Sequence, residues 1–262
     1  FETHPIKHQF GKDLYFVGQT PGMTDLYDDK LITNDLLRKH GLPVPETVLM
    51  NKKHLLENNS PLQLPAVLKP IRGRGSQGVV VVEQESELKN ELQQMLEVGS
   101  YGNSLYLEPY LSGQEITFTV MPPGTYRIKG DIKVFATHWS LPAVKRFNHH
   151  KGVAPYNGLV AVTHNSAVLP DYELEEDRVL KVSKQCELAA ALVEARAPIR
   201  IDCRADAKGK YWLFDLNVKP NMTGASRPHR PDQDSLSALA ARKIGWDFAD
   251  LLENMLRQRW QL

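Results

Sequence analysis

The segment IRIDCRADAKGKYWLFDLN, residues 199–217, decides the fold class and holds the first candidate site. Two runs rich in β-branched and aromatic residues flank the polar stretch 206–210, which is typical of a β-hairpin. We take Lys208 and Gly209 as a two-residue turn, and this turn sets the pairing of the two strands. Because side chains alternate between the faces of a strand, the hairpin has one polar face and one apolar face.

The polar face brings two carboxylates together. In this register Asp202 lies opposite Asp215, and Arg200 lies opposite Asn217. The apolar face suits a core and carries Ile199, Ile201, Cys203, Trp212, Phe214 and Leu216. Facing carboxylates repel, so they need a proton, an arginine or a divalent cation. With the amide oxygen they suit Mg²⁺ shared with substrate phosphates. A salt bridge from Arg200 on a solvated face is the alternative.

A second candidate site is the glycine-rich loop IRGRGSQG, residues 71–78, between strands expected at 66–70 and 79–82. Its glycines and Ser76 can present backbone N–H groups and a hydroxyl to phosphate oxygens, and Lys69 lies at the end of the preceding strand. The loop is not a Walker A motif, because no Gly-Lys-Ser/Thr and no helix follow it. A tight hairpin without a ligand is the alternative.

The rest of the chain mixes helices with strands. Periodicity predicts helices at 28–41, 85–98, 172–195, 235–244 and 247–257, and strands at 47–50, 105–110, 115–121 and 133–139. The stretches 1–27, 122–131 and 141–165 show no clear period and are expected to be loops. We therefore predict the α+β class, with a break between two parts near residues 108–112.

Composition excludes several other classes of protein. A formal net charge of +1 gives no general attraction to nucleic acid or to an anionic membrane. No apolar run approaches the ~20 residues that span a bilayer, and the segment after Phe1 lacks a signal-peptide pattern. Cys186 and Cys203 have no metal-site spacing, so we expect free thiols in a reducing, cytoplasmic compartment.

Taken in order, these motifs resemble the ATP-grasp superfamily, and most closely the D-alanine–D-alanine ligase group. The segments that carry the resemblance are Asp29–Leu31 with Gly41–Val44, Leu68–Pro70 through Gly75–Gly78, Leu107–Glu115, Arg200–Asp202, and Asp215–Asn217 through Pro220–Thr223. The resemblance implies an ATP-grasp fold, in which two α+β subdomains clamp ATP between them. It divides the chain into a linker or remnant of an N-terminal domain at 1–27, a lid subdomain at 28–107 and a catalytic subdomain at 108–262.

The resemblance also implies a nucleotide site. The residues that match ATP-binding positions are Lys30, Lys69 and Ser76 for the phosphates, Glu108, Pro109, Tyr110 and Leu111 for adenine, and Glu115 for the ribose hydroxyls. Asp202, Asp215 and Asn217 match the Mg²⁺ ligands, with Mn²⁺ as an alternative metal, and Asp215 stands where the group usually has Glu. Without the resemblance, Lys30 and Glu115 would be read as surface residues.

Catalytic and substrate roles follow from the same likeness. Arg200 matches the arginine that stabilises the tetrahedral intermediate, Lys151 falls near a substrate-loop lysine, and Ser76 belongs to the lid. Asn221 stands where the group has a glycine that offers its N–H to an oxyanion. Ser235 aligns with a serine that binds a substrate carboxylate, but it follows an inserted stretch, 224–234, and a plain helix start is the alternative. We expect His149 and His150 to be surface loop residues, and substrate contacts are the alternative.

The function implied is that of an ATP- and Mg²⁺-dependent ligase that joins a carboxylate to an amine through an acyl phosphate. Its substrates would be small amino acids or carboxylates, its product a dipeptide of the D-Ala-D-Ala kind, and its assembly a homodimer. Two alternatives stay open. One is an ATP-grasp ligase for another acid and amine. It is favoured by the substrate loop at 146–152, RFNHHKG, which differs from the usual tyrosine-rich version of the group. The other is a nucleotide-binding module without turnover, which the missing N-terminal domain of the group favours.

Overall fold

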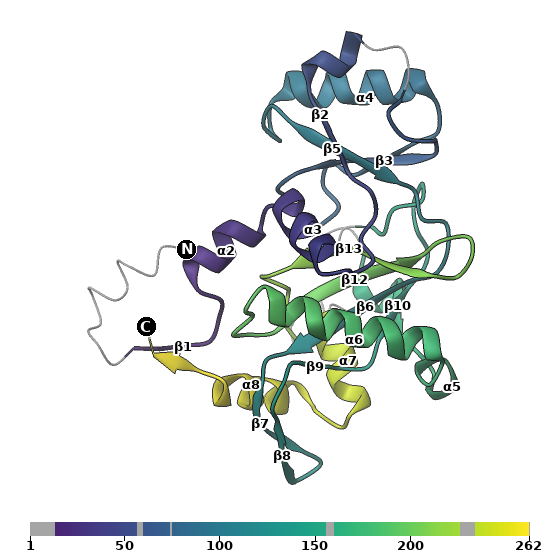
Figure 1. The fold of residues 1–262 in the computed structure, drawn as a ribbon. Coiled ribbons are helices and arrows are strands. Elements are labelled where there is room, and N and C mark those ends of the chain that lie inside the picture. Colours follow the sequence, from purple (N-terminus) through teal and green to yellow (C-terminus); the bar gives the residue numbers. More distant parts are fainter. Residues whose placement is uncertain (1–13, 57–59, 74, 156–159, 226–233, 262) are drawn as a thin grey trace.

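The computed structural model describes residues 14–56, 60–73, 75–155, 160–225 and 234–261, and it contains two large antiparallel sheets (Figure 1). The six-stranded sheet has the order β11 (Ser166–Val168), β10 (Val144–Arg146), β6 (Glu115–Met121), β12 (Ile199–Ala205) and β13 (Tyr211–Asn217), and β9 (Trp139–Ser140) also pairs with β6. The four-stranded sheet has the order β2 (Val48–Met50), β5 (Leu105–Pro109), β3 (Ala66–Pro70) and β4 (Val80–Val82).

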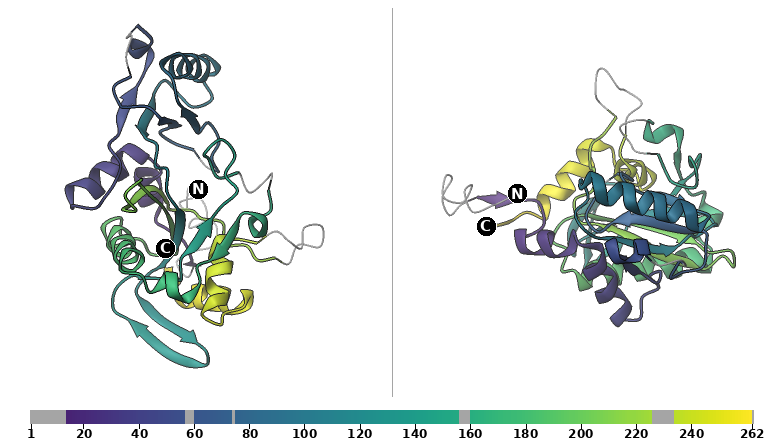
Figure 2. Two further views of the ribbon diagram at one scale, coloured as in Figure 1. Left: turned by 90° about the vertical axis from the view of Figure 1, so that its right-hand side faces the viewer. Right: turned by 90° about the horizontal axis from the view of Figure 1, so that it is seen from above.

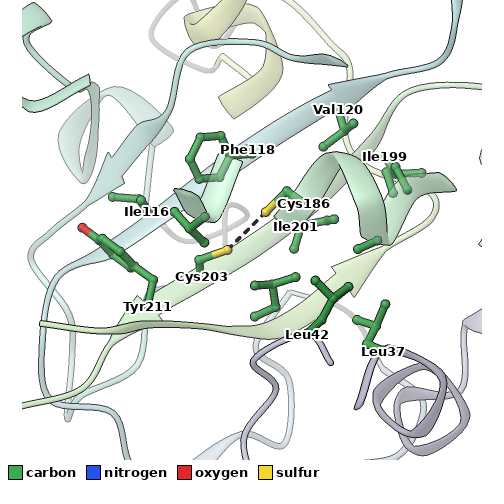
Figure 3. Packing of buried hydrophobic residues seen from close by; sticks show 14 of the residues in the cluster. Leu37, Leu42, Ile116, Phe118, Val120, Cys186, Ile199, Ile201, Cys203 and Tyr211 are labelled. Atoms are coloured by element: carbon green, nitrogen blue, oxygen red, sulfur yellow. Dashed lines mark hydrogen bonds between the residues drawn. The ribbon is translucent and has the colours of Figure 1, made fainter. Parts of the chain in front are cut away.

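Alternation along β6 divides the six-stranded sheet into a core face and a polar face. Ile116, Phe118 and Val120 are buried in one cluster with residues of β12 and of helix α6 (Asp177–Leu192) (Figure 3). Helices α2 (Pro21–Tyr27) and α3 (Lys30–Lys39) add Met23 and Leu37 to this cluster. Glu115, Thr117 and Thr119 point to the opposite face. Helix α7 (Leu236–Lys243) covers the far end of that face, where the Thr119 hydroxyl donates to Ser237 Oγ at 2.8 Å.

The four-stranded sheet is covered on its outer face by helix α4 (Glu85–Val98) (Figure 1). Leu68 of β3 and Leu88 and Leu92 of α4 are buried together. The helix begins with a capping box and ends at Gly99, whose φ of 69° is the left-handed conformation that favours glycine. The inner face of this sheet, which carries Val67 and Lys69 of β3, therefore faces away from α4.

Most predicted elements are present, and several predicted boundaries are close to those observed. The prediction of a loop at 122–131 is wrong. This stretch contains strand β7 (Gly124–Ile128), which pairs with β8 (Asp131–Phe135). Lys129 and Gly130 both have positive φ, so they close a tight hairpin that lacks the usual Asn-Gly signal. The hairpin projects from the body of the molecule (Figure 2).

Three other stretches depart from the predictions. The expected helix 172–195 is divided into α5 (Asp171–Leu174) and α6. The expected loop 141–165 contains β10 and a short 3₁₀ helix (Val162–His164). The described part of 1–27 holds α2 and strand β1 (Tyr15–Phe16), whose partner β14 (Trp260–Gln261) follows helix α8 (Phe248–Arg257).

The two cysteines behave as expected. Cys186 and Cys203 are free and buried side by side in the core, with 3.5 Å between their Sγ atoms (Figure 3). Burial raises the pKa of the Cys203 thiol, which keeps it protonated and apolar. Among the described residues, no helix combines the length and apolar character needed to cross a membrane.

Candidate active site

A cavity of ≈ 360 Å³ lies between the inner face of the four-stranded sheet and the polar face of the six-stranded sheet. It brings together most of the predicted site residues: Lys30, Lys69, Ser76, Glu108, Pro109, Tyr110, Leu111, Glu115, Arg200, Asp202, Asp215, Asn217 and Asn221. Lys151 and Ser235 do not line it. Residues from distant parts of the chain therefore converge on one space, although no single segment carries the site.

The predicted hairpin forms, and its two carboxylates face each other. Asp202 pairs with Asp215, and Arg200 pairs with Asn217, as the sequence predicts. The prediction of a two-residue turn is wrong. The backbone N–H of Asp206 donates to the Lys210 carbonyl, so the turn contains the three residues between them. A bulge between this turn and the carboxylates shifts the register by one residue and restores the predicted pairing.

The bulge also corrects the predicted faces of β13. Trp212 and Phe214 were expected in the core, but Tyr211 and Leu213 are the buried residues there. Phe214 is the extra residue of the bulge, and its side chain lines the cavity beside Asp215. The Lys69 ammonium lies 4.7 Å from the centre of the Phe214 ring, within the range of a cation–π contact.

Asp202 is the most tightly held acid of the site. Arg200 donates from Nε and Nη2 to its two carboxylate oxygens, at 3.0 and 3.1 Å, and the Thr117 hydroxyl donates to Oδ1 at 2.5 Å. Burial alone would raise the pKa of Asp202, but Arg200 and Thr117 outweigh it and hold the pKa below the usual value. The site therefore keeps a buried, ionised carboxylate.

Asp215 is held less firmly. Lys30 Nζ lies 3.3 Å from its Oδ1 and also donates to the Gly73 carbonyl at 3.2 Å, which links α3 to the glycine-rich loop. The contact lacks the geometry of a hydrogen bond, so Asp215 Oδ1 is buried without a donor. In the described residues no three His, Cys, Asp or Glu side chains gather as a metal site. Two facing carboxylates with one unsatisfied oxygen instead fit a cation completed by phosphate oxygens.

The four-stranded sheet, on the opposite side of the cavity, contributes one buried ion pair. Lys69 of β3 and Glu108 of β5 form a salt bridge on the inner face of the four-stranded sheet, with exposed fractions of only 6% and 2%. Burial raises the pKa of Glu108, although Lys69 acts against the shift. Glu108 Oε2 has no hydrogen-bond partner, which leaves one acceptor available to a ligand.

Two further residues, His149 and Arg204, lie around Glu115 at one end of the cavity. His149 Nε2 lies 2.8 Å from Glu115 Oε2, so the prediction that His149 is a surface residue is wrong; His150 is exposed as expected. Arg204 Nη1 lies 3.7 Å from the same oxygen. Arg204 could have been found, because it continues the alternation of Arg200 and Asp202 along β12.

Arg204 ties three segments together around this end. It donates to the Gly152 carbonyl at 2.7 Å and to the Tyr110 hydroxyl at 3.0 Å, and its guanidinium lies over the Tyr110 ring at 4.9 Å. Gly152 has a φ of 76°, and a Cβ there would come within 2.9 Å of the Tyr110 hydroxyl. Glycine therefore allows the loop to approach the strand end that carries Tyr110.

Arg146, at the end of β10, is a third residue that the sequence analysis missed. It lines the cavity, is 7% exposed, and its Nε has no hydrogen-bond partner. Burial lowers the pKa of Arg146, against the attraction of Glu115 and Asp202. The sequence analysis placed it in the expected loop 141–165, where no period pointed to an inward-facing side chain.

The remaining predicted residues lie at or beyond the edge of the cavity. The Ser76 hydroxyl donates to the Ala154 carbonyl at 3.0 Å, so the glycine-rich loop contacts the loop after Lys151. Lys151 itself is exposed. Asn221 Oδ1 accepts from the backbone N–H and the hydroxyl of Thr223.

Ser235 lies outside the cavity, at the start of α7. Its hydroxyl accepts from Ala238 N at 3.0 Å, the geometry of a helix N-cap. The side chain is fully buried, so the structure places Ser235 in the role of a helix start. Most of the inserted stretch before it, at 226–233, lies outside the described residues.

Known proteins match most of the chain. The family described as D-ala D-ala ligase C-terminus matches residues 36–257. A D-alanine–D-alanine ligase of Synechococcus sp. is 25% identical over 95% of this chain and 69% of its own length. That of Chromohalobacter salexigens is 27% identical over 87% of this chain and 64% of its own length. The chain thus spans about two thirds of the length of these curated relatives.

Solved structures share the fold. The D-alanine–D-alanine ligase of Coxiella burnetii superposes with a TM-score of 0.65 at 16% identity, over 92% of this chain and 58% of that one. The Bacillus anthracis ligase, solved as a complex with ATP, gives a TM-score of 0.61 at 22% identity, over 90% of this chain and 66% of that one. The fold is the ATP-grasp fold, and the chain belongs to the family of D-alanine–D-alanine ligase C-terminal domains.

Proposed function

We propose that this chain is the ATP-binding and catalytic part of a ligase that joins a small carboxylate to an amine. The observation that carries the proposal is the pair of facing carboxylates, Asp202 and Asp215, each next to a cation at the floor of the cavity. Such an arrangement suits the binding of phosphates with a divalent metal. The likeness to D-alanine–D-alanine ligases supports amino acids as substrates and dipeptide formation. We also propose that the protein assembles as a homodimer.

The proposed reaction has two displacement steps. A carboxylate oxygen of the acid attacks the γ-phosphorus of ATP, the bond from this phosphorus to the β–γ bridging oxygen breaks, and ADP leaves. The amine of the second substrate then attacks the acyl carbon, loses a proton, and expels inorganic phosphate. Both steps move negative charge through the cavity, so positioned cations supply much of the acceleration.

The cavity residues divide this work. Lys30 and Lys69 face the expected path of the phosphates, and Arg200 offers a planar fork to a tetrahedral oxyanion. Asp202, Asp215 and Asn217 would hold Mg²⁺, which offsets the phosphate charge when bound. Ser76 and its loop would close over the site and exclude water from the acyl phosphate, as a lid does in other enzymes with unstable intermediates.

We further propose that the chain works as two subdomains, 28–107 and 108–262, with helix α3 of the first packed against the core of the second. Strand β5 ends at Pro109 in the four-stranded sheet, and β6 begins at Glu115 in the six-stranded sheet. The short connection between them carries Tyr110 and Leu111, both of which line the cavity. A hinge at this connection would open and close the space in which ATP binds.

The test is ADP release by the full-length protein with ATP and Mg²⁺, screened over single and paired D- and L-amino acids. We expect release that requires a particular pair and yields one new amide by mass spectrometry. Asp215→Ala should reduce the rate at least about a hundredfold. Asp131→Ala, an exposed aspartate on β8, is the matched control and should not change it.

Two outcomes would contradict the proposal in different ways. Binding of ATP without stimulation by any amino acid would remove the amino-acid ligase and leave another acid or a nucleotide-binding module. Turnover that survives Asp215→Ala unchanged would remove the facing carboxylates from the mechanism.

A further inference from the structure

Arg146 is a buried cation on the cavity face of the six-stranded sheet, at the end of β10. In the strand register it lies opposite Glu115 of β6 on one side and Ser166 of β11 on the other. Glu115 pairs in turn with Arg204 of β12, and Thr117, next on the same face of β6, pairs with Asp202. The guanidinium therefore lies on the same sheet face as both acids, next to Glu115 and diagonal to Asp202, and it feels the charges of Glu115, Asp202 and Arg200 without forming an ion pair with either acid.

The nearby acids are already occupied by other cations. Each of the other described Lys and Arg residues of the cavity has an acidic partner: Lys30 with Asp215, Lys69 with Glu108, Arg200 with Asp202, Arg204 with Glu115, and Lys219 with Asp28. Within the described part of the chain, Arg146 makes no side-chain hydrogen bond and no ion pair. Its Nε donor is buried without an acceptor, which is costly unless a ligand binds, and a guanidinium has further N–H donors that an anion in the cavity can satisfy.

The position of Arg146 points to one part of the ligand. Under the proposed function, Glu115 receives the ribose hydroxyls and Asp202 holds the metal of the terminal phosphates. Arg146 lies next to Glu115 and diagonal to Asp202 on the same face of the sheet, so the anion that it meets is the phosphate attached to the ribose. We propose that Arg146 binds the α-phosphate of the nucleotide, as a specificity-determining residue for a nucleotide over a nucleoside. A planar guanidinium suits this role, because it can contact two phosphate oxygens at once.

This inference rests on the proposed function, and binding rather than turnover tests it. The experiment measures the dissociation constants of ADP, AMP and adenosine for the full-length protein by titration calorimetry. Arg146→Gln should raise the dissociation constants of ADP and AMP by about tenfold to a hundredfold and leave that of adenosine unchanged. Lys145→Gln is the matched control, because it removes the same charge from the neighbouring position, on the opposite face of β10. It should leave all three constants unchanged.

A conservative variant guards against loss of folding. Arg146→Lys keeps the charge but loses the two-pronged donor, so we expect a smaller loss for ADP and AMP, and again none for adenosine. If Arg146→Gln does not fold, as judged by thermal melting, the selective loss in Arg146→Lys decides the matter.

Several outcomes would overturn the assignment. A loss for ADP without a loss for AMP would place Arg146 on the β-phosphate. Equal losses for all three ligands would make its role purely structural. Unchanged nucleotide binding with a raised KM for the acid would make it a carboxylate site. A wild-type protein that binds none of the three ligands would refute the proposed function itself, whereas normal nucleotide binding in both variants would refute this inference alone.

Discussion

The two walls of the cavity handle charge in different ways. On the four-stranded sheet, Lys69 and Glu108 form one buried pair, and within the described residues neither side chain has a second charged partner within 4 Å. On the six-stranded sheet, Asp202 is held by Arg200 and Thr117, with Arg146 also within electrostatic reach. The first wall has one ion pair, with Lys30 acting on Glu108 only from a greater distance, whereas the second wall shares the charge of Asp202 among several groups.

This difference separates two uses of a buried charge. A lone buried pair leaves an uncompensated charge as soon as one partner is removed. A shared set retains partial compensation, because the remaining donors still face the same carboxylate. We therefore expect the stability of the protein to be more sensitive to substitution in the ion pair of the four-stranded sheet than in the charged groups of the six-stranded sheet.

The largest effect on stability should come from Lys69→Met. The substitution leaves Glu108 buried without its cation, and removing one partner of such a pair costs about 3–5 kcal/mol. Urea unfolding monitored by circular dichroism measures the loss. The double variant Lys69→Met/Glu108→Gln removes both charges and should recover most of it. A single variant as stable as the wild type would show that the pair is not a buried charge contact.

Arg200→Gln should lower the free energy of unfolding by less, about 1–3 kcal/mol. Asp202 still accepts the Thr117 hydrogen bond and is still stabilised by the nearby charge of Arg146. The same unfolding experiment compares it with Lys69→Met. Turnover should still fall, since Arg200 faces the cavity. A loss of stability larger than that of Lys69→Met would contradict the contrast between the two walls.

Ser76→Ala should affect closure rather than folding. It removes the hydrogen bond from the lid loop to the Ala154 carbonyl, which is worth about 0.5–1.5 kcal/mol. We expect a rise of about twofold to tenfold in the KM for ATP, with unchanged urea unfolding. Ser60→Ala is the control, because Ser60 lies in the same part of the chain as the four-stranded sheet but does not line the cavity. An effect on the unfolding midpoint would mean that the contact between the walls supports the fold itself.

The smallest expected effect on stability comes from His138. This residue lies outside both walls of the cavity, so it serves as a reference for the two. Burial lowers the pKa of His138, and its Nε2 lies 2.8 Å from the Ala195 carbonyl. Its folded pKa is below its unfolded pKa, so its contribution to stability is present above the unfolded value, near pH 6.5, and is lost as the pH falls below it. The free energy of unfolding of the wild type should thus fall more than that of His138→Gln as the pH is lowered from 7.5 to about 5.5. Parallel pH profiles would contradict this.

The parts of the site that lie on regular strands could be predicted from the sequence. Arg200, Asp202 and Asp215 were placed on one face because strand alternation is a local property. The turn was misjudged by one residue, and the bulge compensated, so the register was right although the face of Phe214 was wrong. Local alternation does not reveal where a bulge interrupts it.

The rest of the site could not be predicted, for physical reasons that differ by residue. His149 and Arg146 follow irregular sequence, and only the tertiary packing of β10 against β6 brings them to Glu115. The β7–β8 hairpin was missed because its turn, at Lys129 and Gly130, uses a lysine with positive φ. Ser235 was placed as a helix start by its capping hydrogen bond, which sequence similarity alone does not distinguish from a substrate contact.

The bulge in β13 has a consequence for how such a cavity can change. Without Phe214, Leu213 would still face Cys203 in the core, and Asp215 would still face Asp202 in the cavity. Phe214 is therefore an added residue whose ring enters the cavity while neither face of the sheet is disturbed. A binding site can acquire a new side chain by a single-residue insertion as well as by substitution, and the strand that carries one of its acids can lengthen without moving that acid.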